Sequence, residues 1–215
     1  MGLLKGMNPL PSARRLRAVP AHDPQEDSIR SLLDLAAESA PDVAAHMERT
    51  GRLAKALVQS MDLDGPLARV IVLTARLHDI GKLGIPPRVL EKPGPLSEFE
   101  SDLMREHSMI GQRMLQRRTD LLAIGTLVRA THERWDGLGY PDGLRGSAIP
   151  LPSRIVAVCD AFDAMTRPRC YSASRPIAAA LEELHACAGT QFDPGVAVAF
   201  CELLEDRFDQ LAKGA

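Results

Sequence analysis

The sequence predicts an all-α fold, a single-domain helical bundle, on three observations. Apolar residues recur at spacings of three and four along most of the chain, which is the period of an amphipathic helix. Helix start signals, a capping box and prolines at first helical positions, precede several of these segments. No run of alternating β-branched residues indicates a strand. The 215 residues, 45% of them hydrophobic, suffice for the core of one domain.

The first segment of the chain differs from the rest. Residues 1–24 contain four basic residues and several prolines, with no acid before Asp23. Such a stretch buries little apolar surface, so we predict a flexible basic tail and place the folded domain at residues 25–212. A solvated tail is the expectation, and weak contact with an anionic membrane or nucleic acid is the alternative.

Three helices are predicted before the first polar motif. One runs from Glu26 onward, the second covers residues 42–61, and the third covers residues 67–78. The third is apolar nearly all round, which is typical of a helix buried at the centre of a domain. Gly81 is expected to end it in a left-handed conformation.

More helices follow a Pro/Gly-rich connection at residues 85–95. Ser97 and Glu100 form an S-x-x-E capping box, which predicts the start of the fourth helix. A fifth is expected at residues 120–133, and residues 135–152, rich in glycine and proline, are expected to form a structured loop. Further helices are predicted at residues 153–166 and 176–186, and a last one opens at Asp193-Pro194 and runs to about residue 211.

Composition excludes several classes of protein. The 26 basic and 28 acidic residues nearly cancel, so no strong field indicates a nucleic-acid polymer as partner. No apolar run approaches the roughly 20 residues of an integral membrane segment, and no secretion signal is present, so a cytoplasmic location is expected. The four cysteines contain no CxxC pair, which favours reduced and mostly buried thiols.

The pair His78-Asp79 closes the apolar third helix and precedes Gly81-Lys82. Adjacent ionisable residues are costly to bury unless something pairs with them, and a divalent cation accepts both imidazole nitrogen and carboxylate oxygen. The two oxygens of Asp79 allow it to bridge two ions. A salt-bridged helix terminus is the alternative.

Other ligand-type residues lie on separate predicted apolar helices. They are His46, His107, His132 and Asp160. A single core histidine is usually hydrogen-bonded packing, but ligand types on five helices favour a metal centre inside a bundle. The remaining two histidines, His22 and His185, are expected to be exposed.

The chain resembles the HD-GYP domain, a branch of the HD phosphohydrolase superfamily associated with cleavage of cyclic di-GMP. The motifs that carry the resemblance follow one another from about residue 26 to 204. They are HDIGK at 78–82, LEKPGPLSEFE at 90–100, HERWDGLGYPDG at 132–143, IPLPSRI at 149–155, DAFDAMT at 160–166 and QFDP at 191–194.

The resemblance implies a set of metal ligands. His46, His78, Asp79 and Asp160 would form the first site, and Asp79 would bridge to a second ion that His107 and His132 also hold. Two divalent ions are implied as cofactors, and the mixed imidazole and carboxylate ligands favour iron or manganese over zinc. Asp42 stands where some relatives place an acid for a third ion; a plain helix-start acid is the alternative.

The resemblance also implies roles next to the metal. Asp79 and Lys82 are the expected catalytic residues, with Lys82 contacting the phosphate or assisting the leaving oxygen; a surface charge is the alternative reading of Lys82. The segment Gly139-Tyr140-Pro141 is expected to bind substrate, because glycine permits close approach and tyrosine offers a ring or a hydroxyl. Arg169 is expected to bind a phosphate in bidentate fashion.

The implied function is a metal-dependent phosphodiesterase that hydrolyses cyclic di-GMP to linear pGpG, with GMP as a further product, in bacterial second-messenger signalling. One alternative keeps the chemistry and changes the substrate to another cyclic dinucleotide or nucleotide. Another is a low-activity domain that binds a nucleotide or signalling partner. Thr131 and Ser172, where many relatives have histidine and a basic residue, favour that reading. A sensor or GGDEF-type signalling protein is the implied partner, and a homodimer is left open.

Overall fold

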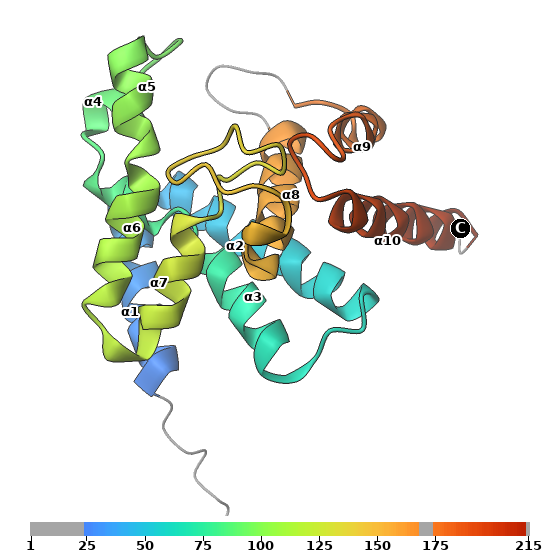
Figure 1. Cartoon of the computed structure of the whole chain (residues 1–215), viewed down its shortest axis with the longest axis horizontal. Coiled ribbons are helices and arrows are strands. Elements are labelled where there is room, and N and C mark those ends of the chain that lie inside the picture. Colours follow the sequence, from blue (N-terminus) through green and yellow to red (C-terminus); the bar gives the residue numbers. More distant parts are fainter. Residues whose placement is uncertain (1–23, 168–173, 214–215) are drawn as a thin grey trace, which may run out of the picture.

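The computed structural model describes residues 24–167 and 174–213, with side chains up to residue 206 (Figure 1). The predicted tail of residues 1–24 therefore lies outside the described residues except for its last residue. Arg169, Cys170 and Ser172 lie outside them too.

The described residues form helices, and the prediction of an all-α fold is confirmed. The first half of the chain contains α1 (Pro24–Ser39), α2 (Pro41–Ser60), α3 (Gly65–Leu77), η1 (Ile80–Gly84), α4 (Pro87–Leu90), α5 (Glu98–Arg105) and α6 (His107–Gln116). The second half contains η2 (Thr119–Leu121), α7 (Leu122–Arg129), η3 (Gly146–Ala148), α8 (Leu151–Thr166), α9 (Ile177–Ala186) and α10 (Pro194–Lys213). Between residues 24 and 213, the described part has no strand, only an isolated bridge between Ala188 and Phe192.

Three helices, α2, α3 and α8, contact one another at the centre of the bundle. In Figure 1, α1, α6 and α7 lie on one side of them and α9 and α10 on the other. One apolar cluster joins α2 and α3 to α8, α9 and α10, and a second joins them to α1, α6 and α7. Of the three central helices, α2 and α3 therefore contribute to both clusters and hold the halves of the domain together.

Two helix start signals read from the sequence are confirmed. The Ser97 side chain accepts from the backbone N–H of Glu100 at 3.3 Å, and the Glu100 carboxylate accepts from the N–H of Ser97 at 2.7 Å. At the start of α10, Asp193 Oδ1 accepts from the N–H groups of Gly195 and Val196. Both caps satisfy donors that a helix start leaves without a partner.

Several predicted boundaries are wrong. The helix that starts after Ser97 breaks at Glu106 into α5 and α6, and the connection at residues 85–95 contains the short α4. The helix expected to reach residue 133 ends at Arg129, so His132 lies in the turn after α7 rather than within a helix. These breaks depend on packing between helices, which the apolar period does not report.

Gly81 does not end α3 in a left-handed conformation, because it lies within η1 and has no positive φ. Gly81 is important because the backbones of η1 and α6 approach each other closely at this residue. A Cβ on Gly81 would lie 1.9 Å from the carbonyl oxygen of His107 and 2.4 Å from the backbone nitrogen of Gly111. Only glycine lets η1 pack against α6 at this distance.

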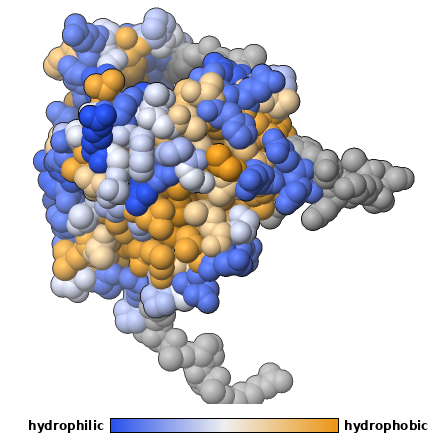
Figure 2. Space-filling view, turned by 45° about the vertical axis from the view of Figure 1, so that its right-hand side comes forward, coloured by the Kyte–Doolittle hydropathy of each residue, from blue (hydrophilic) through white to orange (hydrophobic). Residues whose placement is uncertain are grey.

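One face of the molecule carries both apolar and polar areas (Figure 2). On the face shown in Figure 2, hydrophobic residues gather near the centre and hydrophilic residues border them. Among the helices described, none is long and apolar enough to cross a bilayer. Three cysteines lie within the described ranges, and all three are free thiols, with Cys159 and Cys201 buried.

Candidate metal centre

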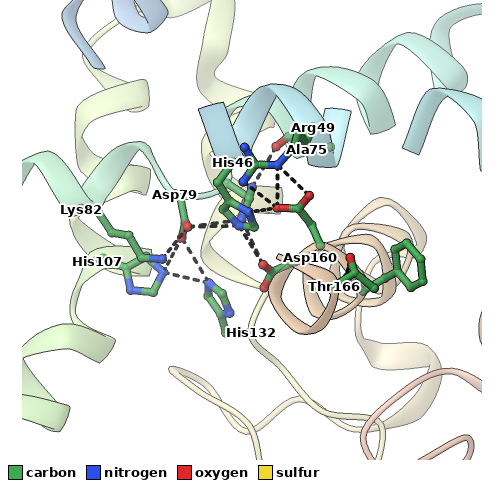
Figure 3. A network of polar contacts seen from close by, with 12 residues as sticks. His46, Arg49, Ala75, Asp79, Lys82, His107, His132, Asp160 and Thr166 are labelled. Atoms are coloured by element: carbon green, nitrogen blue, oxygen red, sulfur yellow. Dashed lines mark hydrogen bonds and ion pairs between the residues drawn. The ribbon is translucent and has the colours of Figure 1, made fainter. Parts of the chain in front are cut away.

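Six predicted ligand residues meet at the centre of the bundle. They are His46 on α2, His78 and Asp79 after α3, His107 at the start of α6, His132 after α7 and Asp160 on α8 (Figure 3). Five of the six contribute ligand atoms to two groups that share Asp79, and Asp160 lies beside the first group without belonging to either. In the group of His46, His78 and Asp79, and in that of Asp79, His107 and His132, the ligand atoms lie within 4.8 Å of one another.

The first group converges on carboxylate oxygens. His46 Nε2 lies 2.9 Å from Asp160 Oδ1 and 3.7 Å from Asp79 Oδ2. His78 Nε2 lies 3.5 Å from Asp79 Oδ2 and 3.7 Å from Asp160 Oδ1. His78 Nδ1 donates to the carbonyl oxygen of Ala75 at 2.8 Å, which leaves the lone pair of Nε2 facing the group.

The second group has the same construction. His107 Nδ1 donates to the carbonyl oxygen of Met104 at 2.7 Å, and its Nε2 lies 3.2 Å from Asp79 Oδ1 and 2.8 Å from His132 Nε2. Two nitrogens that each bind one ion at about 2.1 Å, at right angles, are about 3 Å apart. The spacing of the two imidazoles therefore fits two ligands of one cation.

Two buried atoms of this cluster have no hydrogen-bond partner. They are His78 Nε2 and Asp79 Oδ1. A buried polar atom without a partner costs stability unless something satisfies it, so such atoms point to a ligand. Lys82 Nζ lies 2.5 Å from Asp79 Oδ2, so the salt bridge that was the alternative to a metal site is present. This contact satisfies only one of the two oxygens of Asp79. The donor set therefore fits divalent cations.

The charges of Asp79, Asp160 and His132 also suit metal binding. Burial favours the protonated form of Asp79, but Lys82 and His78 outweigh it and hold the pKa of this carboxyl well below its usual range. Burial likewise opposes ionisation of Asp160, and two neighbouring imidazoles hold its pKa low. Burial lowers the pKa of His132, which keeps this imidazole neutral. Ionised carboxylates and neutral imidazoles are the forms that bind metals.

Sequence reasoning missed the pair that holds His46. His46 Nδ1 lies 2.7 Å from Asp163 Oδ2, and Arg49 donates to both oxygens of Asp163, with Nε 2.8 Å from Oδ1. Although burial opposes it, contacts with Asp160 and Asp163 raise the pKa of His46 to about 9. A signal was present, because Asp160 and Asp163 are three residues apart and so share one face of a helix.

The structure does not bring Asp42 to the cluster. Asp42 is exposed in the first turn of α2, whereas His46, one turn later, is buried. Asp42 contributes no atom to either group of ligand atoms. Thr131 is buried beside His132, but its hydroxyl donates to the carbonyl oxygen of Val128 at 2.9 Å.

The loop that contains Gly139, Tyr140 and Pro141 covers the second group. The rings of Tyr140 and His132 stack with centroids 5.2 Å apart and an interplanar angle of 11°. The guanidinium of Arg105 lies over the Tyr140 ring at 5.9 Å. Burial raises the pKa of Tyr140, and so does the Asp79 charge, so the phenol stays protonated and can donate a hydrogen bond.

Close contacts fix the shape of this loop. The Glu133 carboxylate accepts from the backbone N–H groups of Asp142 at 2.7 Å and Leu144 at 3.0 Å. A Cβ on Gly139 would lie 2.3 Å from the backbone nitrogen of Arg134, so glycine is required there. Glu133, like Asp163 and Arg49, is a residue whose role the sequence did not reveal.

The six candidate ligand residues form a metal-ligand cluster: His46, His78, Asp79, His107, His132 and Asp160. A cavity of about 620 Å³ adjoins this cluster. Its walls include His132, Asp160, Gly139, Tyr140 and Arg105. This volume is in the range of small-molecule sites. Of the predicted substrate contacts, Gly139 and Tyr140 line the cavity, Pro141 is not among its lining residues, and Arg169 lies outside the described residues.

Comparison with known proteins agrees with the arrangement of the site. A family model described as "HD domain" matches residues 30–196. The chain is 41% identical over 166 residues to "Cyclic di-GMP phosphodiesterase" of Thermotoga maritima, which covers 76% of this chain and 45% of that protein. It is 43% identical over 153 residues to "Cyclic di-GMP phosphodiesterase response regulator RpfG" of Xanthomonas campestris pv. campestris, covering 70% of this chain and 40% of the relative.

A third relative is named for a different substrate. The chain is 35% identical over 171 residues to "3'3'-cGAMP-specific phosphodiesterase 2" of Vibrio cholerae, covering 79% of this chain and 32% of that protein. The chain thus spans less than half the length of these three curated relatives.

Solved structures share the fold. Bd1817 of Bdellovibrio bacteriovorus, described as an HDGYP protein, superposes with a TM-score of 0.62 at 19% identity, over 84% of this chain and 62% of that chain. The phosphodiesterase PgpH HD domain of L. monocytogenes, in complex with cyclic-di-AMP, superposes with a TM-score of 0.61 at 18% identity, over 84% of this chain and 96% of that chain. With the family match and the two groups of ligands around His78-Asp79, the chain belongs to the HD domain family and is of the HD-GYP type.

Proposed function

We propose that the chain is a metal-dependent phosphodiesterase that hydrolyses cyclic di-GMP to linear pGpG and then to GMP. The observation that carries the proposal is the pair of ligand groups that share Asp79 beside a cavity with Tyr140 and Arg105 in its walls. The names of the relatives from Thermotoga maritima and Xanthomonas campestris support the same substrate.

The metal ions have a defined task in this proposal. When bound, two divalent ions neutralise the phosphoryl oxygens of the diester and acidify an attacking water. The mixed set of imidazoles and carboxylates favours iron or manganese. His78 and His107 are each held by a backbone carbonyl at Nδ1, so their Nε2 atoms keep one orientation toward Asp79.

Three other residues supply charge and hydrogen bonds. Lys82 contacts Asp79 and keeps it ionised, and it does not line the cavity; we therefore assign it to Asp79 rather than to direct contact with the phosphate. The neutral phenol of Tyr140 donates to a phosphoryl oxygen, and Arg105 adds positive charge next to it. In-line attack of water on phosphorus breaks the bond to the 3′ oxygen, which takes up the proton, and the ring opens to pGpG.

The proposal is tested with protein purified anaerobically and loaded with iron or manganese. Bound metal is quantified by mass spectrometry, and pGpG is followed by chromatography, with Asp79→Ala as control. We expect wild-type turnover and bound metal, and loss of both in the variant. Equal turnover in the two proteins would contradict the proposal.

A second candidate substrate is 3'3'-cGAMP, which the name of the Vibrio cholerae relative supports. The same assay with this nucleotide tests it. The remaining alternative is a domain that binds a nucleotide or a signalling partner without turnover. Thr131 supports this alternative, because its hydroxyl donates to a backbone carbonyl and adds no ligand to the second group. A cytoplasmic location, a homodimer and a sensor or GGDEF-type partner stay predictions.

A further inference from the structure

Helix α9 places in the wall of the cavity a carboxylate that the proposed chemistry does not use. Three carboxylates line the cavity among the described residues: Asp160, Glu133 and Glu183. Asp160 belongs to the ligand cluster, and both oxygens of Glu133 accept from loop N–H groups. Glu183 is therefore the lining carboxylate that is left to accept hydrogen bonds from a bound molecule.

Glu183 forms a pair with Arg175. Arg175 Nη1 donates to Glu183 Oε2 at 3.2 Å, and the other oxygen has a long contact of 3.6 Å with the thiol of Cys187. A thiol is a weak donor, so Oε1 retains most of its acceptor capacity. Both side chains of the pair are about half exposed, at 54% and 48%, and both residues line the cavity.

The backbone of this pair is fixed by two helices. Glu183 lies within α9, which packs against α8, and the backbone N–H of Arg175 donates to the carbonyl oxygen of Met165 on α8 at 2.8 Å. Met165, Ala161 and Phe192 line the same cavity. Apolar side chains beside a polar pair are what a flat aromatic base requires, because its faces pack while its edge forms hydrogen bonds.

The donors and acceptors of the pair match one base. Arg175 brings guanidinium N–H donors, and Glu183 beside it brings two carboxylate oxygens that accept. The Watson–Crick edge of guanine presents the complement: the O6 acceptor, then the N1–H and N2–H donors. Adenine places the lone pair of N1 where the carboxylate stands, so the two acceptors repel and Glu183 loses its partner.

We infer that Arg175 and Glu183 form a guanine-reading site that sets the base specificity of this chain. The inference rests on the proposed function and adds the base that the cavity selects. A guanine held at α9 also fixes which of the two phosphodiester bonds lies at the metal-ligand cluster. The mixed nucleotide 3'3'-cGAMP has one guanine, so it is expected to open at one bond and to give one linear isomer.

The experiment compares cyclic di-GMP, 3'3'-cGAMP and cyclic di-AMP as substrates of the metal-loaded chain. Wild type, Glu183→Gln and Arg175→Ala are measured together with Glu182→Gln. Glu182 is the matched control, because it is an exposed carboxylate on the same helix that does not line the cavity. The readouts are the ratio of kcat/KM for cyclic di-GMP to that for cyclic di-AMP and the ratio of the two linear isomers from 3'3'-cGAMP.

We expect wild type and Glu182→Gln to prefer guanine and to release one isomer. Glu183→Gln is expected to lower the preference for guanine by about 10- to 100-fold and to release both isomers, because charge-assisted hydrogen bonds to the base are lost. A preference and an isomer ratio that are the same in wild type and Glu183→Gln would overturn the inference and leave the proposed function standing, as would a wild type that prefers adenine.

Absence of turnover with all three nucleotides would overturn the proposed function instead. Calorimetry with the slowly hydrolysed bis-phosphorothioate forms of cyclic di-GMP and cyclic di-AMP then decides the base preference. Tighter binding of the guanine form that is lost in Glu183→Gln supports the site. Equal affinities, or no binding of either form, overturn it.

Discussion

At the scale of single residues, the metal-ligand cluster depends on side chains that hold its ligands in position. Asp163 contacts the outward nitrogen of His46 and is itself held by Arg49. Partners of this kind fix the orientation of a metal-binding imidazole, and their loss typically costs 10- to 100-fold in metal affinity. Asp163 and Arg49 thus support the candidate metal centre although neither lies in a ligand group.

Asp163→Asn keeps the shape of the side chain and removes its charge. We expect the affinity for divalent metal to fall by about 10- to 100-fold, because His46 and Arg49 lose their shared carboxylate. Metal titration by calorimetry measures the change. Asp34→Asn, at an exposed position of α1, is the control. An unchanged metal affinity in Asp163→Asn would show that His46 needs no such support.

Gly81 is the second residue with a specific structural task. In Gly81→Ala, the new methyl group would lie 1.9 Å from the carbonyl oxygen of His107, so η1 and α6 must separate. Overpacking of this kind typically costs about 1–3 kcal/mol, and the displacement also moves His107 relative to Asp79.

Urea unfolding and metal titration of Gly81→Ala measure both effects. Gly195→Ala is the matched control, because its Cβ would meet its nearest neighbour, Asp193 Oδ1, at an ordinary 3.4 Å. If Gly81→Ala and Gly195→Ala unfold at the same urea concentration and bind metal alike, the close approach of η1 and α6 is not required.

At the scale of elements, the break between α5 and α6 places a ligand. The prediction is one helix that starts at the capping box of Ser97 and contains His107, but α5 ends at Arg105 and α6 begins at His107. α5 packs against α4, whereas α6 packs against η1 and α7. The change of direction lets His107 stand at the start of α6 and donate to Met104 on the preceding helix. Side-chain patterning along one helix cannot report such a change, because it depends on neighbours far away in the sequence.

The capping box of α5 gives a stability prediction. Ser97→Ala removes the acceptor for the N–H of Glu100, and loss of such a cap costs about 1 kcal/mol. Urea unfolding at neutral pH measures the difference. Ser101→Ala, within the same helix, is the comparison, because alanine favours a helix interior. A Ser97→Ala protein as stable as Ser101→Ala would contradict the cap.

Glu100 adds a pH dependence to the same element. Contacts with Lys92 and with the backbone N–H of Ser97 lower the pKa of Glu100 to about 2. Because the folded pKa is lowered, the stabilisation is complete above the ordinary value near 4.5 and is lost as the pH falls toward 2. An NMR titration of the Glu100 carboxyl in wild type and Lys92→Ala checks this. We expect a higher pKa in the variant, and equal values would contradict the ion pair.

At the scale of the whole molecule, the cluster joins both halves of the bundle. Its ligands come from α2, α6 and α8, from the end of α3 and from the turn after α7. A cation that binds the folded chain and not the unfolded one stabilises it by about 2.7 kcal/mol at a free concentration of 100 times Kd. Bound metal is therefore expected to stabilise the whole domain and not one helix alone.

Removal of metal with a chelator tests this expectation. For a domain of this size, a loss of about 2.7 kcal/mol lowers the Tm by roughly 5–10 °C. Thermal unfolding with and without manganese measures the shift, and Asp79→Ala, which loses the residue shared by both groups, is expected to show none. An equal Tm for loaded and chelator-treated wild type would contradict metal binding by the folded cluster.

The sequence by itself determined the helical class, the caps at Ser97 and Asp193, and the residue types that gather as ligands. Each of these is encoded locally, in the period of apolar residues, in the first turn of a helix or in a short motif. The tertiary structure alone decided that Asp79 is shared by two groups, that Asp163 holds His46, that Asp42 stays apart, and that Arg175 and Glu183 line one cavity. These facts concern distances between atoms that are far apart along the chain. They are set by how helices pack against one another, which the pattern of any one segment does not contain.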